Sequence, residues 1–529
     1  MAPTALLSVS DKEGLVPLAE GLLHQGYQLI SSGGTAAALA AVGLPVCKVA
    51  DHTGAPEILG GRVKTLHPRI HGGILARRAD PAHRADLAAQ AIDPIDVVVV
   101  NLYPFRQTVA DPAVSWELAI ETIDIGGPAM LRAAAKNHDD VVVLTDPAQY
   151  PAFLTALAAG SVDLALRRRL ALAAFRHTAA YDAAIAAWLE ARLGTEGTAA
   201  ADSAEAAAAE RLQLELPLRQ RLRYGENPHQ SASWFSATAS GWGAAVQLQG
   251  KELSYNNLID LEAALATVRE FGYGSAATVA PCVPAAVVIK HTNPCGVATG
   301  SDPADALLRA LDADRVSAFG GIVALNGVVD AAAAEHLAGL FLECVVAPAF
   351  APEARQRLAA KANLRLLELD PAAIAAAPRH QLRSLLGGVL VQESDDAPID
   401  PAAWTVVSRR APSERELEDL RFAWQVVRHV RSNAITIARD GVSLGIGAGQ
   451  TNRVGSAQLA LAAAGERAAG AVLASDGFFP FDDTVRLAAS HGIAAVIHPG
   501  GSLRDTDSIA ACDELGLAML VTGRRHFLH

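Results

Sequence analysis

A lysine and a histidine stand side by side at the end of a strongly apolar run. Residues 285–289 (Ala-Ala-Val-Val-Ile) predict a short buried strand, and Lys290 and His291 follow it directly. Ligands of open α/β sheets bind beyond the carboxyl ends of the strands, and burying a cation or imidazole without a partner is costly. An ammonium group can stabilise an oxyanion, and an imidazole can move protons near neutral pH. The pair therefore indicates a catalytic site, although a solvated strand end also explains Lys290 and His291 taken alone.

Two glycine-rich loops near the N-terminus predict an anion site. Residues 31–35 (Ser-Ser-Gly-Gly-Thr) follow a predicted strand and open a helix, where backbone N–H groups and the helix dipole favour an anion. Residues 60–68 (Gly-Gly-Arg-Val-Lys-Thr-Leu-His-Pro) present Arg62, Lys64 and Thr65 on a second loop. A plain turn or a solvated basic loop could explain either one. Two such loops in one acidic domain favour a phosphate pocket.

Further polar residues follow the predicted strands of this first region. Lys12 comes after the first strand, and residues 101–105 (Asn-Leu-Tyr-Pro-Phe) follow the strand at 97–100. Asp124 precedes a glycine-led helix that ends near Lys136. Taken singly, Asp124 could be only an N-cap and Lys136 only a cation at a helix C-terminus. Because loops after parallel strands open at one sheet edge, we expect these groups to converge there.

Alternating strand and helix signals predict an α/β protein. Residues 1–193 predict a Rossmann-like domain, in which Ser10 and Glu13 have capping-box spacing before the first helix. Residues 194–210 are Ala-rich without large apolar anchors and predict a linker or surface helix. Residues 211–529 are again α/β.

A weak internal repeat suggests two similar lobes in the second region. A strand followed by a glycine turn occurs at Val287–Ile289 before Asn293–Gly296. The same pattern occurs at Ala494–Ile497 before Pro499–Ser502. The pattern is too short to establish the repeat by itself.

Bulk composition limits the class of protein. The chain has 529 residues and a formal charge of −12, which argues against a broad nucleic-acid surface. Its five cysteines are widely spaced and predict neither a disulfide framework nor a paired metal clip, so we expect a cytoplasmic protein. No uninterrupted apolar segment is long enough to predict a membrane span.

The second region contains several further hydrogen-bonding loops. Arg223 and Tyr224 could bind phosphate and stack on a heterocycle. The C-terminal residues 524–529 follow a predicted strand and contain apolar members, so we expect this tail to be tied down. The remaining loops are Ser317–Gly321, Ser432–Ala434, Gly447–Arg453 and Ser475–Phe481.

These motifs resemble the bifunctional purine-biosynthesis family of inosine monophosphate (IMP) cyclohydrolases and transformylases of 5-aminoimidazole-4-carboxamide ribonucleotide (AICAR). The resemblance covers nearly the whole chain in the family's order. It implies a methylglyoxal-synthase-like Rossmann domain followed by a pair of cytidine-deaminase-like α/β/α lobes. The cyclohydrolase half is carried by residues 8–12, 32–35, 60–68, 101–105, 124–127 and 133–138.

The resemblance implies roles for individual residues. Lys290 and His291 match the catalytic pair of the transformylase. The cyclohydrolase would use Lys64, Tyr103, Asp124 and Lys136. The implied substrate-binding residues are Ser10, Lys12, Ser32, Gly33, Gly34, Thr35, Arg62, Thr65, Asn101, Gly126, Gly127, Arg223, Tyr224, Gly320, Asp330, Asn433, Arg453, Phe478, Arg525 and His529.

The family also implies partners, and its deaminase-like fold raises the question of a metal. The formyl donor would be 10-formyltetrahydrofolate, and the protein would be a homodimer that binds neither nucleic acid nor membrane. Zinc deaminases need His-x-Glu and Pro-Cys-x-x-Cys. Residues 294–298 (Pro-Cys-Gly-Val-Ala) lack the second cysteine, so we expect no zinc, whereas a monovalent cation stays open.

Two other functions remain in view. The first domain also resembles methylglyoxal synthase, which would explain the phosphate loops but would leave Lys290 and His291 unused. A non-catalytic nucleotide sensor is the other alternative.

Overall fold

The computed structural model describes residues 2–111, 113–196, 212, 214–273 and 282–529. The chain divides into two compact units, Met1–Leu212 and Gln213–His529. The predicted linker at 194–210 lies mostly outside the described residues, so the predicted domain limits stay a prediction. Within the described ranges, no helix combines the length and the apolar character needed to cross a membrane.

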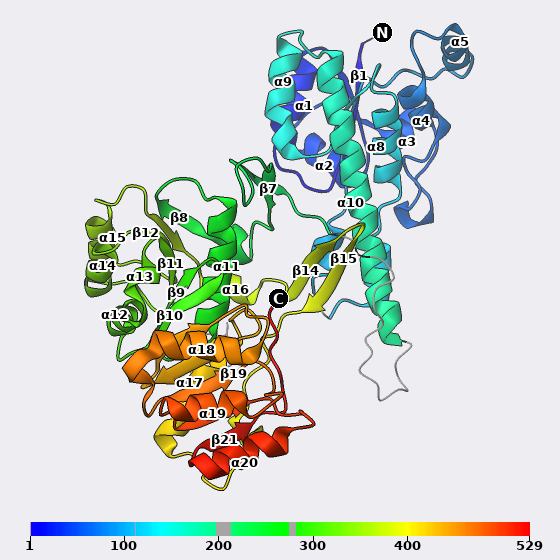
Figure 1. Cartoon of the computed structure of the whole chain (residues 1–529). Helices are drawn as coiled ribbons and strands as arrows, with labels where there is room; N and C mark the ends of the chain where they lie inside the picture. Colours follow the sequence, from blue (N-terminus) through cyan, green and yellow to red (C-terminus); the bar gives the residue numbers. More distant parts are fainter. Residues whose placement is uncertain (1, 112, 197–211, 213, 274–281) are drawn as a thin grey trace. The chain divides into compact units, whose positions relative to one another are not determined.

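The first unit, which Figure 1 draws in blue and cyan, is built on a five-stranded parallel sheet. Its strand order is β3-β2-β1-β4-β5. Its strands are β1 (Thr4–Val9), β2 (Gln28–Ser31), β3 (Cys47–Lys48), β4 (Val97–Asn101) and β5 (Val142–Leu144). Its helices are α1 (Leu15–His24), α2 (Gly33–Ala41), α3 (Val49–Thr53), α4 (Pro68–Leu75), α5 (Pro81–Ala89), α6 (Phe105–Thr108), α7 (Trp116–Glu121), α8 (Gly126–Lys136), α9 (Tyr150–Ala158) and α10 (Leu164–Glu196). The predicted Rossmann-like architecture is confirmed, and every residue of the Val97–Asn101 strand is buried.

One local prediction in this unit is wrong. Ser10 and Glu13 do not form a capping box, because α1 begins later, at Leu15, behind a left-handed Gly14. The N–H of Ser10 instead donates to the side-chain oxygen of Asn101 at the end of β4. A tertiary contact therefore replaces the local cap that the spacing predicted.

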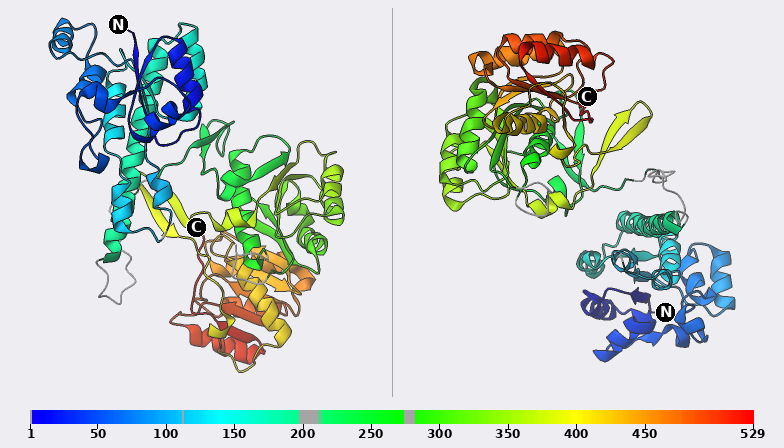
Figure 2. Two further views of the ribbon diagram at one scale, coloured as in Figure 1. Left: turned by 180° about the vertical axis from the view of Figure 1, so that it is seen from behind. Right: turned by 90° about the horizontal axis from the view of Figure 1, so that it is seen from below.

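The second unit contains a twelve-stranded mixed sheet in the order β16-β21-β20-β19-β17-β18-β10-β9-β11-β12-β13-β8. The strands of this unit are β6 (Leu218–Leu222), β7 (Ala232–Phe235), β8 (Val246–Gln249), β9 (Ala285–Lys290), β10 (Asn293–Thr299), β11 (Gly321–Leu325), β12 (Leu342–Ala347), β13 (Arg365–Glu368), β14 (His380–Leu385), β15 (Gly388–Glu393), β16 (Thr405–Val406), β17 (Ile435–Arg439), β18 (Val442–Gly447), β19 (Val472–Ser475), β20 (Ala495–His498) and β21 (Ala518–Val521). The pairs β6-β7 and β14-β15 form two-stranded sheets of their own. Its helices are α11 (Tyr255–Val268), η4 (Arg269–Phe271), α12 (Pro303–Ala313), α13 (Arg315–Ala318), α14 (Ala331–Ala338), α15 (Pro352–Leu358), α16 (Pro371–Ala375), α17 (Glu414–Val427), α18 (Arg453–Ala464), α19 (Asp483–Ser490) and α20 (Asp505–Leu515). The β14–β15 hairpin is exposed along its whole length and projects from the sheet (Figure 2).

The predicted pair of similar lobes is confirmed. The first lobe runs α11-β9-β10-α12-β11-α14-β12-α15-β13, and the second runs α17-β17-β18-α18-β19-α19-β20-α20-β21. An antiparallel contact between β10 and β18 joins the two lobes into one sheet. Buried side chains of both lobes form one core around α11 and α17, and separate cores lie under the helices of the other face.

The predicted pairing of segments within this repeat is wrong. The counterpart of β9 is β17, not the strand at 494–497, and Asn293–Gly296 belongs to β10 rather than to a turn. Close packing explains the glycine at 296, because a Cβ there would lie 2.0 Å from the Ala310 carbonyl oxygen of α12. Gly445 meets the Ala460 carbonyl oxygen of α18 in the same way. The glycine therefore marks a helix–strand approach that recurs in both lobes.

Candidate active sites in the two units

The predicted phosphate loop lies at the carboxyl edge of the first sheet. Ser32 is the N-cap of α2, and its side chain does not cap the helix. Thr35 Oγ1 donates to the carbonyl oxygen of Val9 and accepts the Val9 N–H, both at 3.0 Å. These bonds fix the start of α2, with Gly33 and Gly34 in its first turn, beside the end of β1. Thr35 is buried and supports the loop, while the first turn of α2 can offer N–H donors to an anion.

Lys64 reaches this loop, whereas Arg62 is held elsewhere. A Cβ on Gly33 would lie 3.3 Å from Lys64 Nζ, so the ammonium stands against the start of α2. Its nearest acidic partner is Glu57 Oε2, at 3.4 Å. The exposed guanidinium of Arg62 pairs with the exposed carboxylate of Glu121. Lys64 therefore brings its ammonium to the predicted anion site, whereas Arg62 does not.

Asp124 lies at the start of α8 together with the predicted glycines. Its Oδ1 accepts the Gly127 N–H at 2.8 Å, and its own N–H donates to Tyr181 Oη at 2.9 Å. Thr65 is close by, because a Cβ on Gly126 would lie 2.8 Å from Thr65 Oγ1. Burial raises the pKa of Asp124, and the backbone N–H groups of Gly127 and Tyr103 counter part of that effect. This carboxyl group can therefore exchange a proton more easily than an exposed aspartate.

Asn101 fixes the loop that carries Ser10 and Lys12. The Asn101 amide oxygen accepts the N–H groups of Ser10 and Asp11, and its amide nitrogen donates to the Asp11 carbonyl oxygen at 3.1 Å. The Lys12 ammonium folds back onto the carbonyl oxygens of Val9 and Ser10, and burial lowers its pKa. Ser10 and Asn101 thus shape the loop, while the Tyr103 side chain is exposed beside it.

Within one chain, Lys136 lies away from Asp124 and Thr65. It is the last residue of α8, roughly 15 Å along the helix axis from Gly126 at 1.5 Å per residue. Lys136 lines a groove between α4, α8 and α10, with Arg132 and His138 close by. The Arg132 guanidinium lies 5.7 Å from the centre of the Phe175 ring in the same groove.

In the second unit, Lys290 and Gly320 are neighbours. The Lys290 ammonium donates to the Phe319 carbonyl oxygen at 2.8 Å, and a Cβ on Gly320 would lie 3.1 Å from Nζ. Gly320 has a φ of 68° and donates its N–H to the Phe341 carbonyl oxygen at 2.8 Å. The glycine thus allows the ammonium a close approach that any side chain would crowd.

His291 follows at the tip of the β9–β10 hairpin, and Arg431 joins this tip to the second lobe. Arg431 Nε donates to Thr292 Oγ1, and the Arg431 N–H donates to Asn293 Oδ1, each at 3.1 Å. Arg431 is two residues from Asn433 in the chain. The tip of the first lobe therefore adjoins the loop that starts β17.

That loop centres on a buried carboxylate, Asp476. Asp476 forms an ion pair with Arg453, and both side chains are buried. Asp476 Oδ1 also accepts the Ala434 N–H at 3.1 Å, and Arg453 Nη2 donates to Asn433 Oδ1 at 2.8 Å. Arg453 and Asn433 are thus brought together, and Phe478 is 41% exposed two residues beyond Asp476.

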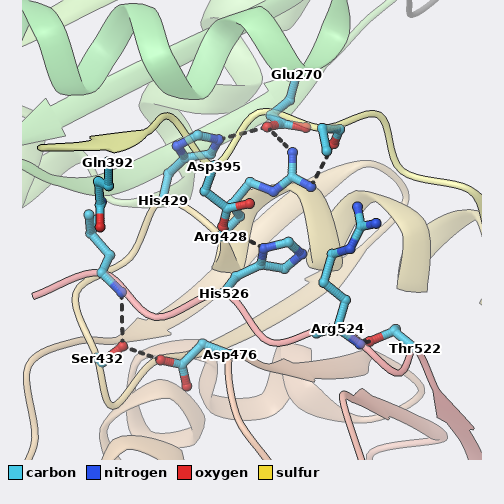
Figure 3. Close-up of polar contacts among 12 residues, drawn as sticks. Glu270, Gln392, Asp395, Arg428, His429, Ser432, Asp476, Thr522, Arg524 and His526 are labelled. Carbon is cyan, nitrogen blue, oxygen red and sulfur yellow. Dashed lines mark hydrogen bonds and ion pairs between the residues drawn. The ribbon is translucent and has the colours of Figure 1, made fainter. Parts of the chain in front are cut away.

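The C-terminal tail is tied to the same loop, as predicted (Figure 3). Ser432 Oγ accepts the Leu528 N–H at 3.2 Å, and His526 Nδ1 lies 2.6 Å from Asp395 Oδ2. The Arg525 guanidinium lies 4.7 Å from the centre of the Phe527 ring. The terminal His529 packs edge-on against the same ring, with the ring centroids 5.9 Å apart.

Among the residues that the structure describes, no contact links two of the predicted binding regions to Lys290. Arg223 and Tyr224 follow β6, where the guanidinium lies 5.6 Å from the centre of the Tyr224 ring. Asp330 caps α14 by accepting the Ala333 N–H at 2.8 Å, beyond the far end of β11 from Gly320. Glu343 follows Leu342, the partner of Gly321 in the β11–β12 ladder, and its carboxylate pairs with Arg365.

Sequence reasoning missed four residues near these clusters: Asp260, Glu343, Arg431 and Asp476. Asp260 could have been selected as a candidate, because it directly precedes the buried Leu261 on a helix that packs against the sheet. Asp476 lies between Ser475 and Gly477, within one of the predicted hydrogen-bonding loops. Only the fold shows that Glu343 and Arg431 approach the same edge.

No cluster of three or more metal-binding side chains occurs among the residues that the structure describes. Cys295 packs with its Sγ 3.5 Å from the Val288 carbonyl oxygen. Burial raises the pKa of Cys295 to about 12.

Comparison with known proteins gives matches along the whole chain. The family described as "AICARFT/IMPCHase bienzyme" matches residues 134–463, and the family described as "MGS-like domain" matches residues 14–129. The chain is 71% identical over 532 residues to the "Bifunctional purine biosynthesis protein PurH" of Synechococcus sp. (strain WH7803), with 100% of both chains covered. It is 72% identical over 535 residues to the protein of the same name from Synechococcus sp. (strain CC9311), again with 100% of both covered. A solved structure titled "Crystal structure of ForH" is 40% identical, covers 36% of this chain and 100% of that chain, and has a TM-score of 0.32. The chain therefore belongs to the AICARFT/IMPCHase bienzyme family.

Proposed function

We propose that the chain catalyses two successive steps of purine synthesis. It transfers a formyl group from 10-formyltetrahydrofolate to AICAR, and it then closes the ring of formyl-AICAR to give IMP with loss of water. The observation that carries this proposal is the full-length identity of 71% to a bifunctional purine biosynthesis protein. The first unit contains Lys64 and the second contains Lys290, so each of the two steps has a cationic site of its own.

For formyl transfer, His291 receives the proton that leaves the AICAR amine. That amine is a poor nucleophile because its lone pair is delocalised, so removing its proton during attack lowers the barrier. An imidazole can both accept and release a proton near neutral pH. Lys290 stabilises the oxyanion at the formyl carbon or protonates the departing folate nitrogen. Its position against Gly320 supports this role, because a residue without a side chain lets the ammonium lie close to the backbone.

For ring closure, positioning and charge stabilisation carry the step, because nucleophile and electrophile belong to one molecule. Lys64 stabilises the oxyanion, and Asp124 and Tyr103 move protons. The raised pKa of Asp124 supports its part in proton transfer. The first turn of α2 and Thr65 hold the phosphate and ribose. Arg62 joins them once its exposed guanidinium leaves Glu121.

The remaining binding residues divide between the two substrates of the second unit. Arg223, Tyr224, Asn433, Arg453 and Phe478 hold the nucleotide or the folate, and Arg525 and His529 close the site from the C-terminal tail. The contacts of Asn433 and Arg453 around Asp476 support their part in one site. Asp330 is the weakest member of the set, because it caps α14 away from Gly320.

The protein acts as a homodimer in this proposal. Lys136 lies at the opposite end of α8 from Asp124, so it can serve ring closure only when a second copy supplies it. A dimer also supplies a cover for the groove that contains Lys136. Sedimentation at increasing concentration, with Lys136→Ala as a second sample, tests both statements.

The proposal places the enzyme in the cytoplasm and includes no zinc. Formyltetrahydrofolate is a co-substrate that is consumed rather than retained. Replacing potassium and sodium by tetramethylammonium in the assay would reveal any requirement for a monovalent cation.

One assay separates this function from its alternatives. The purified chain is given AICAR and 10-formyltetrahydrofolate, and the formation of tetrahydrofolate and IMP is measured. His291→Ala should stop formyl transfer and leave the cyclisation of supplied formyl-AICAR intact. Phosphate release from dihydroxyacetone phosphate would instead indicate methylglyoxal synthase activity, and nucleotide binding without turnover would indicate a sensor.

A further inference from the structure

The turn that carries His291 has an unusual backbone. Lys290 pairs with Asn293 across the hairpin, so His291 and Thr292 alone form the turn. Their φ angles are 51° and 63°. Two-residue hairpin turns with positive φ at both positions normally use Asn-Gly or Asp-Gly, and a β-branched residue such as threonine is strongly disfavoured there. Strain of this kind persists only where the surroundings hold it in place.

The second lobe contains the same turn with ordinary residues. Arg439 pairs with Val442, and Asp440 and Gly441 form the turn with φ angles of 56° and 67°. Asp-Gly is among the best sequences for this geometry. The fold therefore does not require His-Thr at this position, and the first lobe keeps a costly pair where the second has a favourable one.

A carboxylate on the preceding helix holds each turn. The Thr292 N–H donates to Asp260 Oδ1 at 2.7 Å, and the Gly441 N–H donates to Asp419 Oδ1 at 3.1 Å. Asp260 is the sixth residue of α11, and Asp419 is the sixth residue of α17. The two lobes thus share one device, but only in the first lobe does it hold a strained turn with an imidazole.

Three further hydrogen bonds hold the same turn. Thr292 Oγ1 donates to the His291 carbonyl oxygen at 2.7 Å and accepts a bond from Arg431 Nε at 3.1 Å. Asn293 Nδ2 also donates to the His291 carbonyl oxygen, at 3.2 Å. Among the residues that the structure describes, Asp260 is the charged acceptor for a backbone N–H of this turn.

We propose that Asp260 is a positioning residue for formyl transfer, which keeps the His291–Thr292 turn left-handed by accepting the Thr292 N–H. This inference rests on the proposed transformylase activity. Loss of the acceptor lets the turn relax toward a conformation that His291 and Thr292 prefer, and the backbone then no longer directs the imidazole as it does in this structure. A displacement of about 1 Å from the productive geometry is enough to lower a rate by about 10²-fold.

The test compares matched variants in the full-length protein: Asp260→Ala, Asp260→Asn and, as the control, Asp419→Ala. We expect Asp260→Ala to lower kcat for formyl transfer by about 10- to 100-fold, with KM for AICAR changed by less than about threefold. Asp260→Asn keeps an acceptor oxygen and should recover most of that kcat. Asp419→Ala removes the corresponding bond of the second lobe and should leave kcat within about twofold of the wild type.

Two further measurements distinguish positioning from loss of folding. All variants should cyclise supplied formyl-AICAR at the wild-type rate. Asp260→Ala combined with Thr292→Gly should regain part of the lost kcat, because glycine adopts the left-handed turn without help. An equal kcat for Asp260→Ala and Asp419→Ala, or an equal loss for Asp260→Asn and Asp260→Ala, would overturn the inference. A wild-type chain without formyl transfer would overturn the proposed function, whereas an active wild type with an unaffected Asp260→Ala variant overturns only the inference.

Discussion

Glu270 and Arg428 form a buried ion pair, with Glu270 Oε1 2.8 Å from Arg428 Nη1 (Figure 3). Glu270 Oε1 also lies 2.9 Å from His429 Nε2. Glu270 belongs to η4 after the first-lobe helix α11, and Arg428 follows the second-lobe helix α17. The pair therefore joins the two lobes beside the loop of Ser432 and Asp476.

Removing one partner of this pair should destabilise the second unit strongly. Glu270→Ala leaves the Arg428 guanidinium buried without its carboxylate, which costs about 3–5 kcal/mol of unfolding free energy. The exposed pair of Arg357 and Glu335 provides the control, and Glu335→Ala should cost at most about 1 kcal/mol. Urea unfolding of both variants measures the difference, and equal losses would contradict the structural role of Glu270.

The ion pair of Glu270 and Arg428 predicts how the unfolding free energy depends on pH. Burial alone would raise the pKa of Glu270, but hydrogen bonds and charges from His429 and Arg428 outweigh it and hold the pKa below its ordinary value of 4.5. A lowered pKa contributes stability that is fully present above that ordinary value and is lost as the pH falls below it. Unfolding free energies measured from pH 6 to pH 3 should therefore fall less steeply in Glu270→Gln than in the wild type. Parallel curves would show that Glu270 does not contribute to the acid dependence.

Gly296 should tolerate no side chain. A Cβ at this position would lie 2.0 Å from the Ala310 carbonyl oxygen, so Gly296→Ala must push α12 away from β10. We expect a loss of about 2–3 kcal/mol or more, as for other overpacked sites. Gly388 has no atom within 4 Å of its Cβ position, and Gly388→Ala should change stability by less than about 0.5 kcal/mol. Thermal unfolding of the two variants tests this contrast.

Lys64 and Arg62 should affect different kinetic constants of ring closure. Lys64→Ala removes the cation beside Gly33 and should lower kcat by about 10²–10³-fold, as the loss of an oxyanion donor does. Arg62→Ala removes an exposed side chain that already pairs with Glu121, so it should raise KM and leave kcat nearly unchanged. Initial rates with supplied formyl-AICAR measure both constants. A large fall in kcat for Arg62→Ala alone would reverse the assignment.

The apolar runs predicted most of the fold, because strands buried on both faces of a sheet appear in the sequence as continuous apolar segments. Residues 97–100 and 285–289 lie in β4 and β9, and every residue of these two runs is buried. Local patterns failed where a tertiary contact decides the conformation. Asn101 takes the place of the capping box at Ser10, and Asp260 and Arg431 hold a turn that no turn rule predicts at His291.

The candidate sites could be predicted only as separate motifs. Lys64 and the loop of Gly33, and likewise Lys290 and Gly320, do meet in space. Lys136 and Asp330 show the limit, because helix length and strand direction separate each of them from its predicted partners. These directions depend on the topology of the sheet, which single motifs do not contain.

The central claim is that two separate clusters carry two successive steps, and mixing two inactive variants tests it most directly. Lys64→Ala should convert AICAR to formyl-AICAR and stop there, while His291→Ala should leave AICAR unchanged. An equimolar mixture of the two, supplied with AICAR and 10-formyltetrahydrofolate, is predicted to form IMP. A mixture that forms no IMP, or Lys64→Ala forming IMP alone at the wild-type rate, would contradict the account.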